Sequence, residues 1–263
     1  MPTLDASACA VLLDELTAIA ARAAEAILAL ARRPDVRTKA DGSPVTAADE
    51  AAEAIICEGL RRISPNVPII SEEQAAQKNP GPIESGSYFL VDPLDGTREF
   101  VAGRDEYTVN IALMTEREPQ LGVICAPAAG IIWRGIVGKG ADRIDGAATN
   151  KPVPIRVRPQ PADKVIVMAS RSHLDPQTQV LMKALPQAIL IQIGSSVKFC
   201  WIADGKADLY PRLAPTHDWD IAAGHAILQA AGGSVTSPDG SPVVYGTKEL
   251  LIPAFVGRGG IKD

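Results

Sequence analysis

The sequence predicts an α/β protein in which layers of helix and sheet alternate. A chain of 263 residues with 46% hydrophobic residues can bury one large core or two modest ones. Short apolar runs between residues 108 and 137 are separated by glycine, proline and charge, which predicts an antiparallel meander of strands. Beyond residue 162, strand-like and helix-like runs alternate, a pattern typical of an α/β layered domain.

The N-terminal part predicts two helices joined by a hairpin. Apolar residues recur at steps of three and four over residues 5–31, which predicts one long helix. The polar segment 37–45 contains an Asp-Gly pair and favours a hairpin. Thr46 and Asp49 have the spacing of a capping box, with Asp in place of the usual Glu, and predict the start of a helix over 46–62.

The remaining elements follow from the same patterns. In the first half we expect a polar loop at 74–87 and strands at 67–70, 88–91, 108–114, 121–126 and 131–137. Residues 138–162 show no clear period, so we place a boundary there, between subdomains 1–145 and 146–263. In the second half we expect strands at 165–169, 189–193, 207–210, 234–236 and 251–256, and helices at 176–185, 195–203 and 219–231.

Composition excludes several classes of function. The formal charge is −5 and there is no basic stretch, which argues against nucleic-acid binding. There is no apolar run of 18 residues and no secretory signal, so we expect no membrane-spanning helix. Four scattered cysteines without a CxxC pair fit a reducing cytoplasm. Contact with the inner membrane face and the oligomeric state, a homodimer included, stay open.

The segment 90–97 carries the first candidate site. Asp92 and Asp95 follow an apolar run, and Pro93 and Gly96 break the strand there. Two such carboxylates about 4 Å apart would repel by roughly 4 kcal/mol at an effective dielectric constant near 20, so a cation should neutralise them. Carboxylate oxygens suit Mg²⁺. The alternative is an ordinary turn, because Asp-Pro and Asp-Gly are common turn dipeptides.

Other acidic and anion-binding points occur elsewhere in the chain. Glu72 and Glu73 follow the predicted strand 67–70, and Asp218-Trp-Asp220 opens a helix. The segment 194–198, Gly-Ser-Ser-Val-Lys, also opens a helix, where free backbone N–H groups favour an anion. For these helix starts the alternative is a simple N-cap.

These motifs together resemble the inositol monophosphatase superfamily of Mg²⁺-dependent, lithium-sensitive phosphatases. The resemblance rests on three motifs that occur in the family's order and spacing: Asp92-Pro-Leu-Asp-Gly-Thr97, Ser71-Glu-Glu73 and Trp219-Asp220. Within the superfamily the chain is most similar to CysQ-type 3'(2'),5'-bisphosphate nucleotidases, through the segments 39–49, 106–112, 170–173, 194–200 and 210–212. The resemblance implies a five-layered α-β-α-β-α sandwich of the inositol monophosphatase/fructose bisphosphatase type, with the site between two subdomains.

The resemblance also implies roles for individual residues. Metal ligands would be Glu72, Asp92, the carbonyl group of Leu94, Asp95 and Asp220. Asp49 and Thr97 would orient and deprotonate the attacking water, and the backbone N–H groups of Gly96 and Thr97 would hold the scissile phosphate. The metal ligands other than Asp92 would also lie against the substrate. The nucleotide itself would contact Ser172, His173, Gly194, Lys198 and Arg212.

The implied activity is removal of the 3'-phosphate from 3'-phosphoadenosine 5'-phosphate, a by-product of sulfate assimilation, to give AMP and phosphate. Two or three Mg²⁺ ions would support direct attack by water, without a covalent phosphoenzyme. Ile221 stands where close relatives often have Thr, and His217-Asp218 replaces apolar or amide residues. These departures leave the choice of substrate open, with an inositol monophosphatase or sugar-phosphate phosphatase as the alternative. A separate alternative is a non-catalytic regulator that binds Mg²⁺ and nucleotide.

Overall fold

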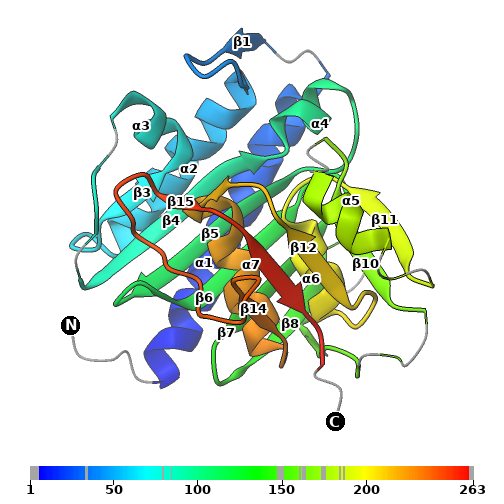
Figure 1. Cartoon of the computed structure of the whole chain (residues 1–263). Helices are drawn as coiled ribbons and strands as arrows, with labels where there is room; N and C mark the ends of the chain where they lie inside the picture. Colours follow the sequence, from blue (N-terminus) through cyan, green and yellow to red (C-terminus); the bar gives the residue numbers. More distant parts are fainter. Residues whose placement is uncertain are drawn as a thin grey trace.

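Helices and strands alternate along the chain in the computed structural model (Figure 1). It describes residues 6–32, 35–78, 80–83, 85–146, 151–159, 161, 164–172, 176–183, 185 and 187–260. The helices are α1 (Ala6–Leu30), α2 (Ala47–Ile63), α3 (Glu72–Gln77), α4 (Thr97–Val101), α5 (Pro176–Lys183), α6 (Val197–Ala203) and α7 (Asp218–Ala230).

Two sheets contain most of the described strands. Within the described ranges the first sheet has seven strands in sequence order, β3 (Ile69–Ser71), β4 (Ser87–Asp95), β5 (Thr108–Thr115), β6 (Glu118–Ala126), β7 (Ile131–Ile136), β8 (Gly140–Asp145) and β9 (Val153–Ile155). Neighbouring strands in this sheet run antiparallel, except β3 and β4, which run parallel.

The second sheet has five strands among the described residues. In spatial order they are β11 (Ile189–Ile193), β10 (Ile166–Ser170), β12 (Leu209–Arg212), β16 (Phe255–Arg258) and β14 (Ser234–Thr236). Two short pairs complete the described part: β1 (Val36–Thr38) with β2 (Pro44–Thr46), and β13 (Thr216–His217) with β15 (Leu251–Ile252).

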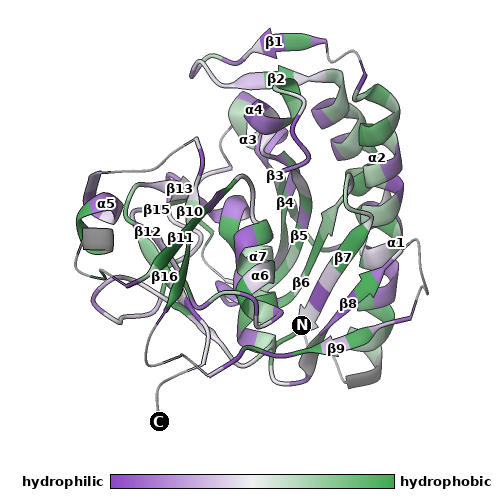
Figure 2. Ribbon diagram, turned by 90° about the vertical axis from the view of Figure 1, so that its right-hand side faces the viewer, coloured by the Kyte–Doolittle hydropathy of each residue, from purple (hydrophilic) through white to green (hydrophobic). Residues whose placement is uncertain are grey.

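The described elements stack in five layers (Figure 2). Helices α1 and α2 cover one face of the seven-stranded sheet, and α6 and α7 lie between the two sheets. Helix α5 lies on the outer side of the five-stranded sheet. The predicted α-β-α-β-α layering is therefore confirmed.

Both faces of the first sheet are buried against helices. One apolar core joins it to α1 and α2, and a second joins it to α6, α7 and the five-stranded sheet. Strand β5 shows the consequence, because Val109 and Ile111 lie in the first core while Ala112 and Met114 lie in the second. A strand covered on both faces is apolar throughout instead of alternating with polar residues.

Helix α7 lies very close to its neighbours because glycines leave room for it. A Cβ on Gly122 of β6 would lie 2.3 Å from the carbonyl oxygen of Ala223. On the opposite side, a Cβ on Gly224 would lie 2.3 Å from Cδ2 of Phe199 in α6. Close packing on both sides fixes the position of α7. It therefore also fixes the first turn of α7, which contains Asp220.

Most predicted elements are confirmed within a few residues, including the long first helix, the 37–45 hairpin and the capping box. Two short helices near the predicted site were missed. Helix α3 occupies the start of the predicted loop 74–87, because Gln-Ala-Ala-Gln favours a helix and the two preceding glutamates suit its first turn. Helix α4 follows directly after Gly96.

Other differences concern strands. The sequence predicts that this strand ends at residue 91, but β4 continues to Asp95 through a register shift against β5. Such a bulge accommodates Pro93, which has no N–H group for the ladder. The predicted strand 251–256 is divided into β15 and β16 around Pro253.

The patternless segment 138–162 contains β8 and β9, whose pairing extends the first sheet beyond residue 146. The boundary between residues 145 and 146 stays a prediction. Among the described residues, no helix combines the length and the apolar character needed to cross a membrane.

Candidate active site

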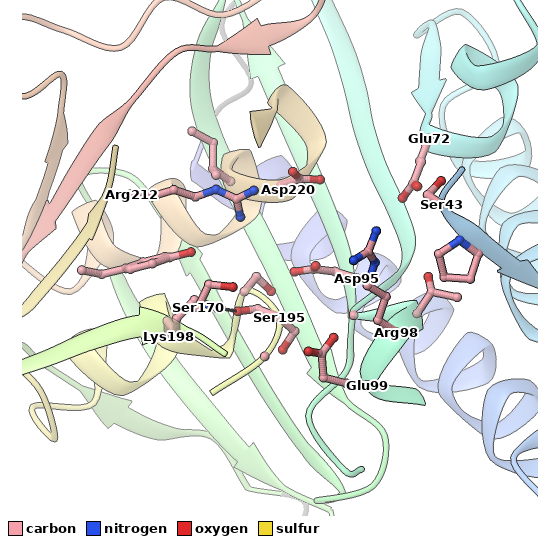
Figure 3. Close-up of a pocket in the computed structure, with 17 residues that line it drawn as sticks. Ser43, Glu72, Asp95, Arg98, Glu99, Ser170, Ser195, Lys198, Arg212 and Asp220 are labelled. Atoms are coloured by element: carbon pink, nitrogen blue, oxygen red, sulfur yellow. Dashed lines mark hydrogen bonds between the residues drawn. The ribbon is translucent and has the colours of Figure 1, made fainter. Parts of the chain in front are cut away.

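A polar pocket of about 190 Å³ lies where the ends of β3 and β4 meet the N-termini of α6 and α7. Figure 3 shows Asp95 near its centre, with Asp220 and Arg212 on one side and Glu72 on the other. Eight predicted site residues line it: Glu72, Asp95, Gly96, Thr97, Gly194, Lys198, Arg212 and Asp220. Asp92 and Leu94 are almost completely buried beside them.

The end of β4 turns sharply at Gly96. Its φ of 95° lies in the left-handed region that favours glycine, and a Cβ there would lie 2.8 Å from the carbonyl oxygen of Glu106. The turn begins with Asp92, whose Oδ1 accepts a hydrogen bond from the backbone N–H of Leu94 at 3.1 Å. The chain therefore folds locally so that Asp92, Asp95 and the first residues of α4 surround one point.

Asp49 and Thr97 form the hydrogen-bonded pair that the family resemblance implies. The Thr97 hydroxyl lies 3.0 Å from Asp49 Oδ1 and 3.1 Å from the carbonyl oxygen of Leu94. Asp49 Oδ2 accepts hydrogen bonds from the backbone N–H of Thr46 at 2.8 Å and from its hydroxyl at 2.6 Å. Asp49 thus caps α2 while its second oxygen faces Thr97. Burial raises the pKa of this carboxyl, although the Thr46 bonds oppose the shift.

Lys39, in the turn between β1 and β2, forms ion pairs with the two glutamates that follow β3. Its ammonium lies 2.7 Å from Glu72 Oε1 and 2.7 Å from Glu73 Oε1. Burial raises the pKa of Glu72 to about 7; Lys39 opposes the shift, and the charge of Asp220 adds to it. Glu72 is therefore a carboxylate that a positive group must stabilise in its charged form.

Asp220 is positioned by the first turn of α7. Its Oδ2 accepts hydrogen bonds from the backbone N–H of His217 at 3.0 Å and from the hydroxyl of Thr216. The backbone pair belongs to a capping box around His217. As with Asp49, helix capping and a place in the pocket are compatible.

The carboxylates repel one another across the pocket. Burial, then the charge of Asp220, raises the pKa of Asp95 to about 7, while Lys198 and Arg212 oppose the shift. Burial and the charges of Glu72, Asp95 and Asp220 raise the pKa of Asp92 well above its usual range. Such mutual repulsion is what a bound divalent cation would relieve.

No three described His, Cys, Asp or Glu side chains converge as a finished metal site would. Glu72 is turned toward Lys39, and Asp220 is bonded to Thr216. Each of these two carboxylates therefore already has a hydrogen-bond partner at the pocket. The donor set itself, carboxylates and a backbone carbonyl, consists of the hard oxygen ligands that Mg²⁺ prefers.

Two cations lie on the opposite wall. Burial lowers the pKa of Lys198 to about 8, and the charge of Asp95 opposes that shift. The Lys198 ammonium bonds to the carbonyl oxygen of Ile193 at 3.2 Å and to that of Ser195, and lies 5.0 Å from the centroid of the Tyr210 ring. Arg212 Nε is buried without a hydrogen-bond partner among the described residues. The wall can therefore offer positive charge to an anion.

The other predicted nucleotide contacts differ in their positions. Gly194 lines the pocket, and Ser172 donates a hydrogen bond to Glu99, which also lines it. His173 lies outside the described residues.

Several polar residues outside the predicted site also belong to the pocket or contact it. Ser43, Arg98, Glu99, Ser170, Ser195 and Ser196 line it. Asn110 and Glu106 contact residues that line it. Asn110 lies opposite Asp92 in the sheet, and its Nδ2 is 3.4 Å from Asp95 Oδ2. Its Oδ1 accepts a 2.7 Å hydrogen bond from Ser196, which links the first sheet to α6. A polar residue inside the apolar run 109–114 was the available signal for Asn110. Glu106 begins the segment 106–112 that carries part of the family resemblance, but no site role was assigned to it. For Glu99, which contacts Ser172 far along the chain, no local signal exists.

Comparison with known proteins gives a consistent result. The family model described as "Inositol monophosphatase family" matches residues 11–260. The 3'(2'),5'-bisphosphate nucleotidase CysQ of Escherichia coli strain K12 is 41% identical over 251 residues, 93% of this chain and 98% of that protein. The CysQ of Buchnera aphidicola is 37% identical over 94% of this chain and 92% of its own length.

Solved structures agree. The crystal structure of CysQ from Bacteroides thetaiotaomicron superposes with a TM-score of 0.80 at 34% identity, covering 96% of this chain and 98% of that one. The inositol monophosphatase from Anabaena has a TM-score of 0.76 at 27% identity, with 95% and 91% covered. The family predicted from the acidic motifs is confirmed: this chain belongs to the inositol monophosphatase family.

Proposed function

We propose that this protein is a Mg²⁺-dependent 3'(2'),5'-bisphosphate nucleotidase that removes the 3'-phosphate of 3'-phosphoadenosine 5'-phosphate. The observation that carries the proposal is the division of the pocket into an acidic side and a basic side. Glu72, Asp95 and Asp220 suit cations beside one phosphate, while Lys198 and Arg212 suit a second anionic group. The CysQ relatives, 41% identical, carry this activity in their names.

The donor set fits Mg²⁺. Glu72, Asp92, Asp95, Asp220 and the carbonyl group of Leu94 are the residues that would hold it, and we propose two or three ions. The raised pKa values of Glu72 and Asp95, both about 7, support the fit. Burial is the main cause of both shifts and the charge of Asp220 adds to them, and a bound cation would stabilise the charged form of each carboxylate. When bound, Mg²⁺ supplies a more acidic water and neutralises charge on the phosphate.

The chain's own residues would position the reactants. The backbone N–H groups of Gly96 and Thr97 would hold the phosphate at the start of α4, beside the Thr97 hydroxyl. The bond from that hydroxyl to Asp49 Oδ1, at 3.0 Å, gives a route for the proton of the attacking water. Water oxygen would bond to phosphorus as the bond from phosphorus to the ribose 3'-oxygen breaks, and Asp49 would receive the water proton through Thr97. The leaving 3'-oxygen would keep the bonding electrons and take up a proton from solvent water.

The basic wall would hold the rest of the nucleotide. Arg212 presents a buried Nε with no partner among the described residues, which favours it as a ligand for the second phosphate. Lys198 already bonds to two backbone carbonyls, so its charge would act from behind the turn at Ser195. Roles for Ser172, His173 and Gly194 in holding the nucleotide, a cytoplasmic location and a homodimer stay predictions.

The proposal is tested by phosphate release from purified protein. The substrates are 3'-phosphoadenosine 5'-phosphate, inositol 1-phosphate and fructose 1,6-bisphosphate, each with Mg²⁺ and with EDTA. We expect strong preference for the nucleotide and no release in EDTA. Preference for inositol 1-phosphate or the sugar bisphosphate would instead support the alternative phosphatases. Mg²⁺ and nucleotide binding without any release would support a non-catalytic regulator.

A further inference from the structure

One carboxylate of the N-terminal half holds two loops of the C-terminal half in place. Arg171 Nε lies 2.8 Å from Glu106 Oε2, and Arg171 Nη2 lies 2.7 Å from Glu106 Oε1. Glu106 Oε2 also accepts the backbone N–H of Gly194 at 2.7 Å. Arg171 in turn donates to the carbonyl oxygen of Gln192 at 2.7 Å. We call Glu106, Arg171 and Gly194 the Glu106 clamp.

The clamp acts on the turn that follows β11. A Cβ on Gly194 would lie 2.7 Å from Glu99 Cγ and 2.8 Å from the carbonyl oxygen of Glu106, so the turn is pressed directly against the N-terminal half. The next residue, Ser195, has a φ of 52°, which is unusual for a residue with a side chain. Lys198 bonds to its carbonyl oxygen from the other side. A strained turn held from both sides is characteristic of a positioned functional segment.

Two of the three clamp residues, Glu106 and Arg171, lie outside the pocket. Gly194, Ser195, Ser196 and Lys198 line the pocket, whereas Glu106 and Arg171 do not. The Arg171 side chain is 40% exposed, and exposed ion pairs add little to folding stability. The bidentate geometry nevertheless fixes both groups in orientation. The consequence of the clamp therefore falls mainly on the position of the pocket wall.

We propose that Glu106 is a positioning residue that, through Arg171 and Gly194, fixes the wall against which the nucleoside part of the substrate lies. The inference rests on the proposed nucleotidase function and deepens it. A small phosphate ester needs the phosphate-holding turn at Gly96 but little of this wall. Loss of the clamp should therefore weaken recognition of the nucleotide more than hydrolysis of a small ester.

The chain offers a control with a similarly exposed arginine, whose carboxylate partner, Asp208, is more deeply buried than Glu106. Arg158 binds Asp208 at 2.8 and 2.7 Å, and Asp208 Oδ2 accepts the backbone N–H of Ile166 at 2.7 Å. The Arg158 side chain is 36% exposed, close to the value for Arg171. None of these three residues lines the pocket. Arg158→Gln removes the same kind of bidentate pair without touching the wall.

The experiment compares the full-length wild type with Arg171→Gln, Glu106→Gln and Arg158→Gln. For the first two variants we expect the KM for 3'-phosphoadenosine 5'-phosphate to rise about tenfold, as for loss of a charged hydrogen bond, with kcat changed less than about twofold. The kcat/KM for inositol 1-phosphate should change little. Arg158→Gln should match the wild type on both substrates.

Two readouts do not depend on turnover. AMP affinity, measured by calorimetry, should fall about tenfold in Arg171→Gln and stay constant in Arg158→Gln. Hydrogen exchange of residues 192–198 should be faster in Arg171→Gln than in the wild type. Unchanged AMP affinity together with unchanged exchange would overturn the inference, and so would equal effects in both arginine variants. Failure of the proposed function would instead appear as a wild type that releases no phosphate.

Discussion

Replacement of Asp95 by Asn should stabilise the protein in the absence of metal. Asp95 lies among like charges, and burial with the nearby Asp220 raises its pKa from 3.8 to about 7. An ionised carboxylate with a raised folded-state pKa opposes folding, because the unfolded chain ionises it more easily. This destabilisation of the folded state is absent below about pH 4 and grows as the pH rises toward 7. Asn keeps the shape of the side chain and removes the charge.

The magnitude follows from the difference between the two pKa values. A pKa of about 7 against 3.8, at about 1.4 kcal/mol per unit, corresponds to about 4 kcal/mol at pH 8. This is an upper limit, because Glu72 and Asp220 share the same repulsion. For a chain of this size roughly 2–4 °C accompany each kcal/mol, so the melting temperature should rise by up to about 16 °C.

The assay is thermal unfolding of wild type and Asp95→Asn in EDTA at pH 8 and pH 4, repeated at pH 8 with saturating Mg²⁺. Mg²⁺ at 100 times its Kd should stabilise the wild type by about 2.7 kcal/mol and the variant much less. Asp208→Asn is the control, because that carboxylate is paired with Arg158 and its loss should destabilise the protein at pH 8. If Asp95→Asn is less stable than the wild type in EDTA at pH 8, the electrostatic argument is wrong.

Three further predictions concern other contacts of the site. Thr97→Val removes the hydroxyl bonded to Asp49 and should lower kcat about 100-fold, while the Mg²⁺ affinity measured by calorimetry stays unchanged. A wild-type kcat in this variant would contradict the proposed proton route. Gly194→Ala should weaken AMP binding in calorimetry, because its Cβ would lie 2.7 Å from Glu99 Cγ, and wild-type affinity would show that the turn can move. Lys39→Gln leaves Glu72 and Glu73 without their counterion, so the free energy of unfolding, measured with urea in EDTA at pH 8, should fall by about 3 kcal/mol. An unchanged free energy of unfolding would mean that these ion pairs contribute nothing to stability.

The parts of the fold that the sequence predicted are those with a local signal. The capping box at Thr46 and Asp49 marks the start of α2 within one residue. The apolar runs that became β5, β6 and β7 were recognisable because helices cover both faces of the sheet. Helix α4 has only five residues, and β8 consists mainly of polar and small residues, so neither gave a periodic signal.

The same distinction applies to the site. The acidic residues at strand and helix ends were predictable because each stands beside its own turn or cap. Their partners were not: Lys39 reaches Glu72 across 33 positions, and Arg171 reaches Glu106 across 65. Such pairs depend on how the layers stack, which no local spacing encodes. Asn110 lies between these two cases. A polar side chain inside a buried strand must have a hydrogen-bond partner, but the sequence does not show that the partner is Ser196.

In the proposed reaction the pocket removes the 3'-phosphate of a nucleoside bisphosphate while its basic wall retains the other phosphate. The most direct measurement is phosphorus NMR of 3'-phosphoadenosine 5'-phosphate incubated with the wild-type protein and Mg²⁺. We predict that the 3'-phosphate signal disappears as inorganic phosphate and 5'-AMP accumulate in equal amounts. Loss of the 5'-phosphate, or an unchanged spectrum from protein that binds Mg²⁺, would contradict the proposed reaction.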